Sequence, residues 1–496
     1  MRTRPVGGIV RVTVGWAAFA GLVALLWVGM ISRIGHYDVA VFLRAGAAIQ
    51  AGHNPYPTPG TAAVYSGSAF VYPYLTALPF VPLSSLSAAG DLFVAGSVLA
   101  VLAGVRLAGV RDLRVHALVL AASTTVIGLQ MGTFNALLFA ALALAWRARD
   151  RALVCGTVVA LVIYSKVFLA PLLVWLLLAR RWRAAGAAGA VLAALIGVSA
   201  LVSPLGLVDY VALLGQLGRV EARAGISLTG LLTGVGLSIS TAGRLARLAA
   251  LAVLAGCWWA ARRGHDERLA YTGGVVAALL ASPVVWCHYL LLLVAPLLAL
   301  SRPVTPHPRD GRDPEDGPGP GDGPGSEGGR DTRGGRVPRD RRPVSAGPIA
   351  LFAAGSWLLV TPHRTTGTDL AVTAVIGLPL VLSCLLSPGP DRTFGGRRRP
   401  IRPDVTLVAS RTVRTITFGL LILGLAAVHA AGARAAGPYA VCVGLGVILA
   451  FAVRSTATPW AIPTSGGLTA TPTEPGPADR VNTDEGPLPH RRTGAP

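Results

Sequence analysis

The sequence predicts an all-helical protein that crosses a membrane many times, and three observations support this prediction. Hydrophobic residues make up 53% of the 496 residues and charged residues only 14%, whereas soluble domains carry about 25% charged residues. The apolar residues form long runs, such as 14–31 and 185–202, and runs of about 18 or more are typical of membrane spans. Arginines gather at the ends of these runs, as they do on the cytoplasmic side of membrane proteins.

Threading the apolar runs between these arginines predicts a bundle of about 10 to 14 spans. The runs interpreted as spans cover residues 12–31, 88–109, 115–130, 133–146, 152–164, 167–179, 184–203, 242–261, 269–281, 284–300, 348–361, 370–387, 413–432 and 437–453. The first is too long for a signal peptide and lacks a cleavage site after it. Several others are shorter than a straight crossing needs. The pair at 152–164 and 167–179 is either two half-helices or one helix kinked at Pro171.

Polar stretches divide the chain into regions. Residues 32–87 and 204–241 are predicted to be extracytoplasmic loops within a membrane region, residues 1–301, that carries the candidate site. Residues 302–347 are rich in Pro, Gly, Asp and Arg, so they cannot bury enough surface to fold and predict a disordered cytoplasmic linker. Further transmembrane helices follow at 348–454, and a second disordered cytoplasmic segment at 455–496. The threading predicts a multi-pass protein of the cell membrane with both termini in the cytoplasm.

Composition also argues against two classes of function. The net charge of +21 is spread over the ends of the spans, whereas nucleic-acid-binding proteins carry a basic face or stripe. We therefore expect a lipid bilayer as partner and no nucleic acid. The five cysteines lie in or beside apolar runs without CxxC spacing, which indicates neither a disulfide framework nor a metal site. They are Cys155, Cys257, Cys287, Cys384 and Cys442.

Polar residues that packing does not easily explain gather on the extracytoplasmic side of this threading. They are Asp38, Gln130, Asn135, Lys166, Ser227 and His288. Lys166 is the most distinctive because it is the only lysine among 44 basic residues. A charged group at membrane depth is costly and usually functional, although a lysine that extends to the interface is the alternative.

The other members of this group have structural alternatives as well. Asp38 precedes a helix predicted over 39–51, so it is placed to act as an N-cap. His288 can be a buried, hydrogen-bonded histidine near Trp286, and Gln130 and Asn135 can bond helices to one another. Four tyrosines of the first loop are typical in part of an interfacial aromatic belt. They are Tyr37, Tyr56, Tyr72 and Tyr74.

The extracytoplasmic groups favour one reaction class. A glycosidase needs two carboxylates, one of them to protonate a poor leaving group, and carboxylates are few on this side. Transfer from a phosphate-activated sugar needs a single base, because phosphate leaves without a proton when cations stabilise its charge. Asp38 is the candidate base, and Lys166, His288 and Arg44 are candidates to hold the phosphate.

The order of several short motifs resembles the C-type membrane glycosyltransferases, specifically glycosyltransferase family 87, the polyprenol-phosphate-mannose-dependent mannosyltransferases. The resemblance covers roughly residues 10 to 300 and rests on order, since each motif alone is loose. The motifs are Tyr37-Asp38, Arg44-Ala45-Gly46, Gly52-His53-Asn54-Pro55-Tyr56, Phe70-Val71-Tyr72-Pro73-Tyr74 with Pro79 and Pro82, Gln130 with Asn135, Ser165-Lys166-Val167 with Pro171, Arg180-Arg181-Trp182-Arg183, and Ser282-Pro283 with Trp286 and His288.

The resemblance implies a helical bundle whose extracytoplasmic loops carry short helices, and an inverting transfer of mannose from a polyprenyl-phosphate donor. No metal ion or nucleotide cofactor is expected, and the acceptor is a glycolipid, a lipoglycan or another cell-envelope molecule. It implies that Asp38 is catalytic and that the donor is held by Lys166, His288, Arg44, Tyr72, Gln130 and Asn135. Ser227 belongs to the acceptor loop, where Ile226 stands in place of the family's asparagine.

Two other classes of function remain as alternatives. A multi-pass transporter or flippase of a lipid-linked or small-molecule substrate would carry ionisable residues near the bilayer midplane and internal repeats. No repeat is evident, and the polar residues gather at one face. A non-catalytic membrane scaffold would bind partners through residues 302–347. That alternative predicts that replacement of Asp38 leaves function intact.

Overall fold

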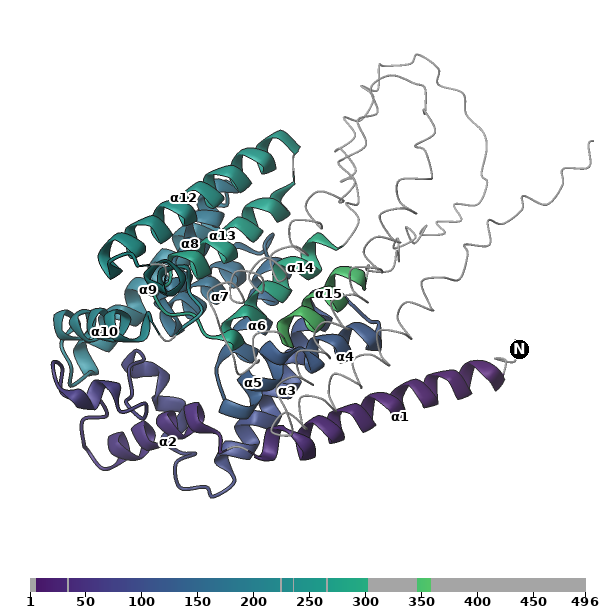
Figure 1. Cartoon of the computed structure of the whole chain (residues 1–496), viewed down its shortest axis with the longest axis horizontal. Helices are drawn as coiled ribbons and strands as arrows, with labels where there is room; N and C mark the ends of the chain where they lie inside the picture. The colour runs from purple at the N-terminus through teal and green to yellow at the C-terminus, as the bar shows by residue number, and fades with distance from the viewer. Residues whose placement is uncertain are drawn as a thin grey trace, which may run out of the picture. The chain divides into compact units, whose positions relative to one another are not determined.

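A computed structural model describes residues 6–33, 35–223, 225–234, 236–264, 266–301 and 346–357, and every regular element within these ranges is helical (Figure 1). This confirms the predicted all-helical fold class. The spans predicted at 370–387, 413–432 and 437–453 and the segment at 455–496 lie outside the described residues, as does nearly all of the predicted linker.

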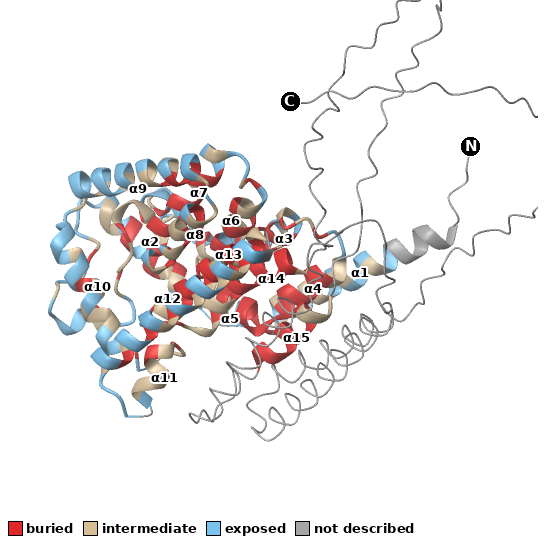
Figure 2. Cartoon of the chain, turned by 90° about the horizontal axis from the view of Figure 1, so that it is seen from above, coloured by how far each residue is buried: buried red, intermediate tan, exposed pale blue. Residues whose placement is uncertain are grey.

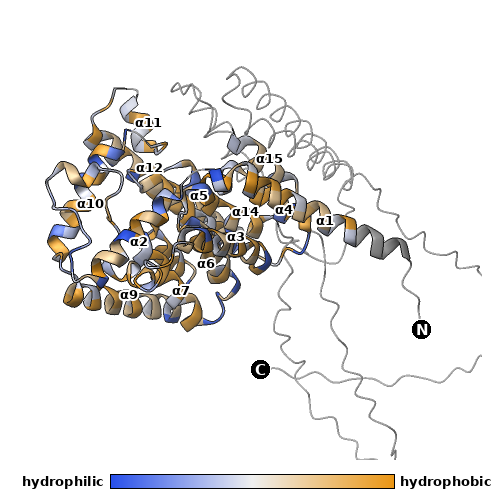
Figure 3. Cartoon of the chain, turned by 90° about the horizontal axis from the view of Figure 1, so that it is seen from below, coloured by the Kyte–Doolittle hydropathy of each residue, from blue (hydrophilic) through white to orange (hydrophobic). Residues whose placement is uncertain are grey.

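Four of the described helices are long and apolar enough to cross a membrane. They are α1 (Val6–Gly29), α3 (Ala89–Leu107), α9 (Trp182–Val202) and α12 (Ile239–Gly264). Apolar side chains on these helices are exposed, such as Leu99 on α3 and Leu201 on α9. Figure 2 shows the exposed outer face of α9, and Figure 3 shows its apolar character. A surface that is both exposed and apolar is suited to lipid, so the chain is a polytopic helical membrane protein.

The span predicted at 115–130 is a broken helix. Helices α4 (Leu113–Ala121) and α5 (Ser123–Met131) meet at an angle of 62°. The last described helix, α15 (Gly347–Ser356), supplies partners at this break. The backbone N–H of Ser123 donates to Ser356 Oγ at 2.9 Å, and Trp357 Nε1 donates to the carbonyl of Ala121 at 3.0 Å. These bonds replace the helical ones that the bend removes.

Shorter helices fill the interior of the bundle. They are α6 (Asn135–Arg147), α7 (Ala152–Ser165), α8 (Pro171–Leu178), α13 (Glu267–Ala281) and α14 (Val294–Leu300), with short 3-10 turns at Val167–Leu169 and Cys287–Leu293. The chain breaks at Lys166, where the backbone is extended, and Pro171 only begins α8. The alternative of one helix kinked at Pro171 is therefore wrong, because proline here occupies a helix start, where it is tolerated.

Small residues allow these helices to approach closely. A Cβ on Gly156 of α7 would lie 2.5 Å from the carbonyl oxygen of Ala184 on α9. A Cβ on Gly104 of α3 would lie 2.5 Å from the ring of Phe139 on α6. Small residues at interfaces are how membrane helices gain packing contacts, since lipid provides no hydrophobic driving force between helices.

The helices run so that arginines collect at one end of the bundle. Arg181, which follows α8, donates to the carbonyl of Arg149 and to Asp150, both of which precede α7. It also pairs with Glu267 at the start of α13, with Nη2 2.7 Å from Oε2. We call this the arginine end. Because α7 starts here and contains 14 residues, Lys166 lies about 21 Å away, at the opposite end.

Short helices from the two predicted loops cover that opposite end, which we call the polar end. The first loop forms α2 (Tyr37–Gln50) and 3-10 turns at Ala62–Tyr65, Tyr74–Thr76 and Leu78–Phe80; the second forms α10 (Leu207–Glu221) and α11 (Leu228–Gly234). Figure 1 shows α2 and α10 on one side of the described helices. Phe42 of α2 is the centre of an aromatic cluster, with ring centroids 4.5 Å from Tyr72 and Phe134 and 5.1 Å from Phe80.

Candidate active site

Asp38 lies in the first turn of α2, and its position is fixed by the residue two places before it. His36 is the N-cap of α2, and its ring contacts the carbonyl of Gln130 at 3.0 Å and Asp91 at 3.1 Å. Asp38 is therefore the second residue of the helix, and His36 occupies the N-cap position that was expected for Asp38. A carboxylate in the first turn is stabilised by the helix dipole. Asp38 is half-buried, and no hydrogen bond or ion pair links its carboxylate to another described residue.

Lys166 is the buried cation of the site. The break between α7 and the following 3-10 turn places it at the polar end with only 7% of its surface exposed. Its Nζ donates to the phenol oxygen of Tyr289 at 2.8 Å and to that of Tyr72 at 3.4 Å. It also lies 4.1 Å and 5.1 Å from the centres of the two rings. The side chain therefore does not extend to the interface.

The two tyrosines are themselves held by aromatic neighbours. Tyr289 stacks on Phe168, with ring planes 8° apart and centroids separated by 5.4 Å. Tyr72 packs against Phe42, and its backbone carbonyl accepts a hydrogen bond from Tyr56 at 2.9 Å. Burial raises the pKa of Tyr72, so its phenol is neutral near pH 7. The partners of Lys166 among the described residues are thus dipoles and π faces, and none of them is a carboxylate.

Asp38 and Lys166 influence each other without forming a salt bridge. Burial raises the pKa of the Asp38 carboxyl, and the positive charge of Lys166 lowers it in part. No acidic oxygen of a described residue lies within 4 Å of the Lys166 ammonium. The site therefore combines a half-buried carboxylate with a buried cation that does not form a salt bridge with it.

His288 and Asn135 contribute buried polar atoms without partners. Nδ1 of His288 and Oδ1 of Asn135 are buried and make no hydrogen bond among the described residues. The two residues meet around α5, because a Cβ on Gly128 would lie 3.4 Å from His288 Cβ and 3.2 Å from Thr133 Oγ1, which also accepts from Asn135. Buried polar atoms without partners are uncommon and unfavourable.

Gln130 and Ser227 hold the scaffold of the site. Gln130 Nε2 donates to the carbonyl of Met30 at 3.1 Å, which ties α5 to the end of α1. Ser227 Oγ donates to the carbonyl of Pro283 at 2.6 Å and accepts from the N–H of Gly230 at 2.9 Å. Ser227 thus caps α11 and ties the second loop to the segment that leads to His288. The bond of Gln130 between α5 and α1 is the structural alternative described above.

Arg44 is not brought to this group of residues. It is exposed on α2, six residues after Asp38. At about 100° per residue it lies about 120° around the helix from Asp38. Tyr289 and His36, by contrast, take part in the site and were not selected from the sequence. The position of Tyr289 directly after His288 is the signal that could have identified it.

Comparison with known proteins gives one match. Residues 70–283 match the family model described as glycosyltransferase family 87. No curated protein and no solved structure matches the chain. The matched region contains Tyr72, Asn135 and Lys166, whereas Asp38 and His288 lie outside it.

Proposed function

From the match of residues 70–283 to glycosyltransferase family 87, we propose that the chain is a member of this family that transfers mannose from a polyprenyl-phosphate donor to a cell-envelope acceptor. The family indicates a glycosyltransferase embedded in a membrane, with a sugar donor and an acceptor. The donor, the glycolipid or lipoglycan acceptor and the inverting mechanism are the proposed part. We also propose that the protein lies in the cell membrane, that the reaction takes place on the extracytoplasmic face and that both termini are cytoplasmic.

One observation carries the proposal: Lys166 is a buried cation, and among the described residues its hydrogen-bond partners are neutral phenols. A charge in such a position is unfavourable unless an anion accompanies it. The phosphate of a lipid-phosphate sugar is an anion of the required kind, and its lipid tail would remain in the bilayer. Asn135 and His288 offer further buried polar atoms for the remaining phosphate or sugar oxygens.

The proposed step uses Asp38 as general base. Asp38 accepts the proton of the acceptor hydroxyl while the acceptor oxygen bonds to the anomeric carbon of the donor sugar. The bond between that carbon and the phosphate oxygen breaks, and its electron pair leaves with polyprenyl phosphate. Lys166 stabilises the negative charge that develops there. Attack opposite to the leaving phosphate inverts the configuration of the anomeric carbon.

The remaining candidates have supporting roles in this proposal. Tyr72 and Tyr289 orient the Lys166 ammonium, Gln130 fixes α5 relative to α1, and Ser227 fixes the acceptor loop. Arg44 is exposed on α2. We propose that it contacts the donor headgroup at the entrance of the site and does not bind the phosphate.

Transfer of labelled mannose in membranes tests the proposal. Membranes that contain the wild type, Asp38→Asn or Asp209→Asn at equal expression are supplied with polyprenyl-phosphate mannose. Asp209 is the matched control, since it also lies in the first turn of a helix at the polar end and is exposed. We expect labelled lipid product with the wild type and Asp209→Asn, and a loss of at least about 100-fold with Asp38→Asn. Near-normal transfer by Asp38→Asn would contradict the role of Asp38. Absence of transfer by the wild type with every acceptor offered would contradict the choice of donor.

A further inference from the structure

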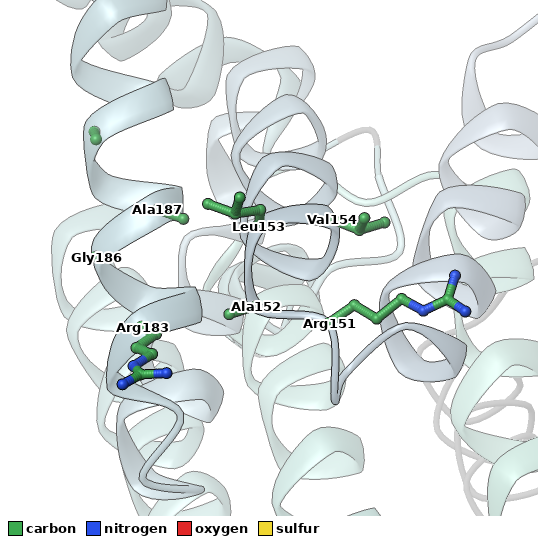
Figure 4. Close-up of a pocket in the computed structure, with 8 residues that line it drawn as sticks. Arg151, Ala152, Leu153, Val154, Arg183, Gly186 and Ala187 are labelled. Atoms are coloured by element: carbon green, nitrogen blue, oxygen red, sulfur yellow. The ribbon is translucent and has the colours of Figure 1, made fainter.

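A second site lies at the arginine end, about 21 Å from Lys166 along α7. A hollow of about 720 Å³ opens there between the first turns of α7 and α9. Its polar edge is formed by Arg151 and Arg183, and its apolar wall by Leu153, Val154, Ala187 and Ala190. Figure 4 shows Leu153 reaching from α7 toward Ala187 on α9, with Arg183 below Ala187 and the Arg151 side chain extended to the other side of α7.

The arginines of this hollow differ from their neighbours in what they contact. Arg181 is committed to Glu267 and Asp150, and Arg149 also lies 3.7 Å from Glu267. Arg151 and Arg183 are exposed, and no described acidic side chain lies within 4 Å of either. Two positive charges therefore remain at the edge of an apolar hollow. The N-caps of α7 and α9 add no side-chain hydrogen bond, so the first N–H groups of both helices are open to an anion as well.

The apolar wall of the hollow is exposed on a surface that is suited to lipid. α9 is one of the helices suited to cross the membrane, and beyond Arg183 it exposes large apolar side chains such as Val198 and Leu201. Leu153 is 76% exposed and Trp182 is 63% exposed beside the arginines. Tryptophan next to basic residues is typical of the membrane interface. Moving from Trp182 into the bundle, the hollow changes from charged to apolar, in the order of a phospholipid headgroup followed by its acyl chains.

We propose that this hollow binds an anionic phospholipid of the leaflet at the arginine end. Arg151 and Arg183 pair with the headgroup phosphate, and an acyl chain lies along Ala187 and Ala190 on α9. The site does not touch Asp38 or Lys166, so the proposal is independent of the transfer reaction.

Lipid retention by the purified full-length chain tests this proposal. The protein is exchanged into detergent with phosphatidylglycerol or phosphatidylcholine, and bound lipid is measured by native mass spectrometry over a range of lipid concentrations. The variant Arg151→Gln/Arg183→Gln should bind phosphatidylglycerol roughly 30-fold more weakly, since each basic residue near the membrane surface contributes a similar share of the affinity for anionic lipid. The control Arg106→Gln/Arg147→Gln removes the same charge from the last turns of α3 and α6 and should bind as the wild type does.

A second variant keeps the charge and fills the apolar wall. Ala190 is exposed in the hollow, so Ala190→Trp should fold and should also weaken phosphatidylglycerol binding. Equal binding by the wild type and both test variants would overturn the proposal. If the Arg106→Gln/Arg147→Gln control lost phosphatidylglycerol binding to the same extent, the binding would reflect general charge attraction, and the proposal would be overturned too. Displacement of the lipid by soluble glycerol phosphate at comparable concentration would assign the site to a free phosphate and not to a lipid.

Discussion

The ammonium group of Lys166 lies 2.8 Å from the phenol oxygen of Tyr289 and 4.1 Å from the centre of the same ring. One side chain therefore holds the cation both by a hydrogen bond and by its π face. Neither contact neutralises the charge, as a carboxylate would. A site arranged in this way keeps its positive charge available for an incoming anion, and its parts can be tested separately.

Removal of the phenol oxygen alone should weaken donor binding. Tyr289→Phe keeps the ring that stacks on Phe168 but removes the hydrogen-bond acceptor of Lys166. A hydrogen bond to a charged group contributes about 1.5–3 kcal/mol, so we expect the KM for the lipid-phosphate donor to rise roughly tenfold or more. Steady-state kinetics in detergent would measure this. Tyr65→Phe is the control, and an unchanged KM in Tyr289→Phe would show that the hydroxyl does not position the ammonium.

The pH dependence of transfer should report the environment of Asp38. Burial raises the pKa of this carboxyl, and a general base acts only when it is deprotonated. The acid limb of the kcat/KM profile should therefore lie above pH 3.8, the ordinary value for aspartate. Lys166 lowers this pKa, so Lys166→Met should move the acid limb of kcat to higher pH at saturating donor. A limb that does not move would show that the two groups are not coupled.

Enlargement of Gly156 should separate two helices. Gly156→Val places branched carbons where the backbone of Ala184 and the Cβ of Ala187 already lie, at 2.5 Å and 2.7 Å from a first added carbon. Overpacking of this kind typically costs 1–3 kcal/mol, and we expect a lower thermal midpoint of the detergent-solubilised protein. Gly189→Ala is the control, because nothing lies within 4 Å of its added carbon. Equal midpoints for the two variants would contradict close packing of α7 against α9.

Loss of the ion pair at the arginine end should destabilise the bundle. Arg181→Gln removes two bonds to Glu267 and one to Asp150, and these residues join the starts of α7, α9 and α13. With side chains 20% and 26% exposed, we expect a loss of about 2 kcal/mol. Arg180→Gln is the control because Arg180 is exposed. Thermal unfolding would compare them, and the double variant Arg181→Gln/Glu267→Gln should be no worse than Arg181→Gln alone if the two side chains act as a pair.

Much of the helical layout could be predicted from the sequence. The run at 152–164 corresponds to Ala152–Ser165 and the run at 88–109 to Ala89–Leu107, because apolar length and flanking arginines are local signals. The break between α4 and α5 could not be predicted. Its residues are Ala121, Ala122 and Ser123, and neither proline nor glycine marks it, since the bonds that stabilise it come from a distant part of the chain.

The sequence predicts at which end of the bundle the candidate site lies, but it does not predict the individual contacts of the site. Alternating spans place Lys166, His288 and Asn135 at one end. All three side chains are buried in the structure, and Tyr289, which directly follows His288, contacts Lys166. Tyr72 was predicted at the donor site, but Tyr289, the other tyrosine partner of Lys166, was not predicted because an aromatic residue in an apolar run usually indicates packing. Likewise, Ser227 caps α11 through the nearby Gly230, but its bond to the carbonyl of Pro283, 56 residues away, depends on the tertiary fold.

The bond between Ser123 and Ser356 also has a consequence for biosynthesis. These residues are 233 positions apart, and chains are synthesised at about 5–20 residues per second. Synthesis of the chain therefore takes roughly 10 to 50 s to proceed from Ser123 to Ser356. During that interval the N-terminal helices are already in the membrane, but the backbone N–H of Ser123 lacks this hydrogen-bond partner. An insertase or another membrane chaperone that protects this region would act in that period, and truncation before α15 should lead to proteolysis even though residues 70–283 are present in full.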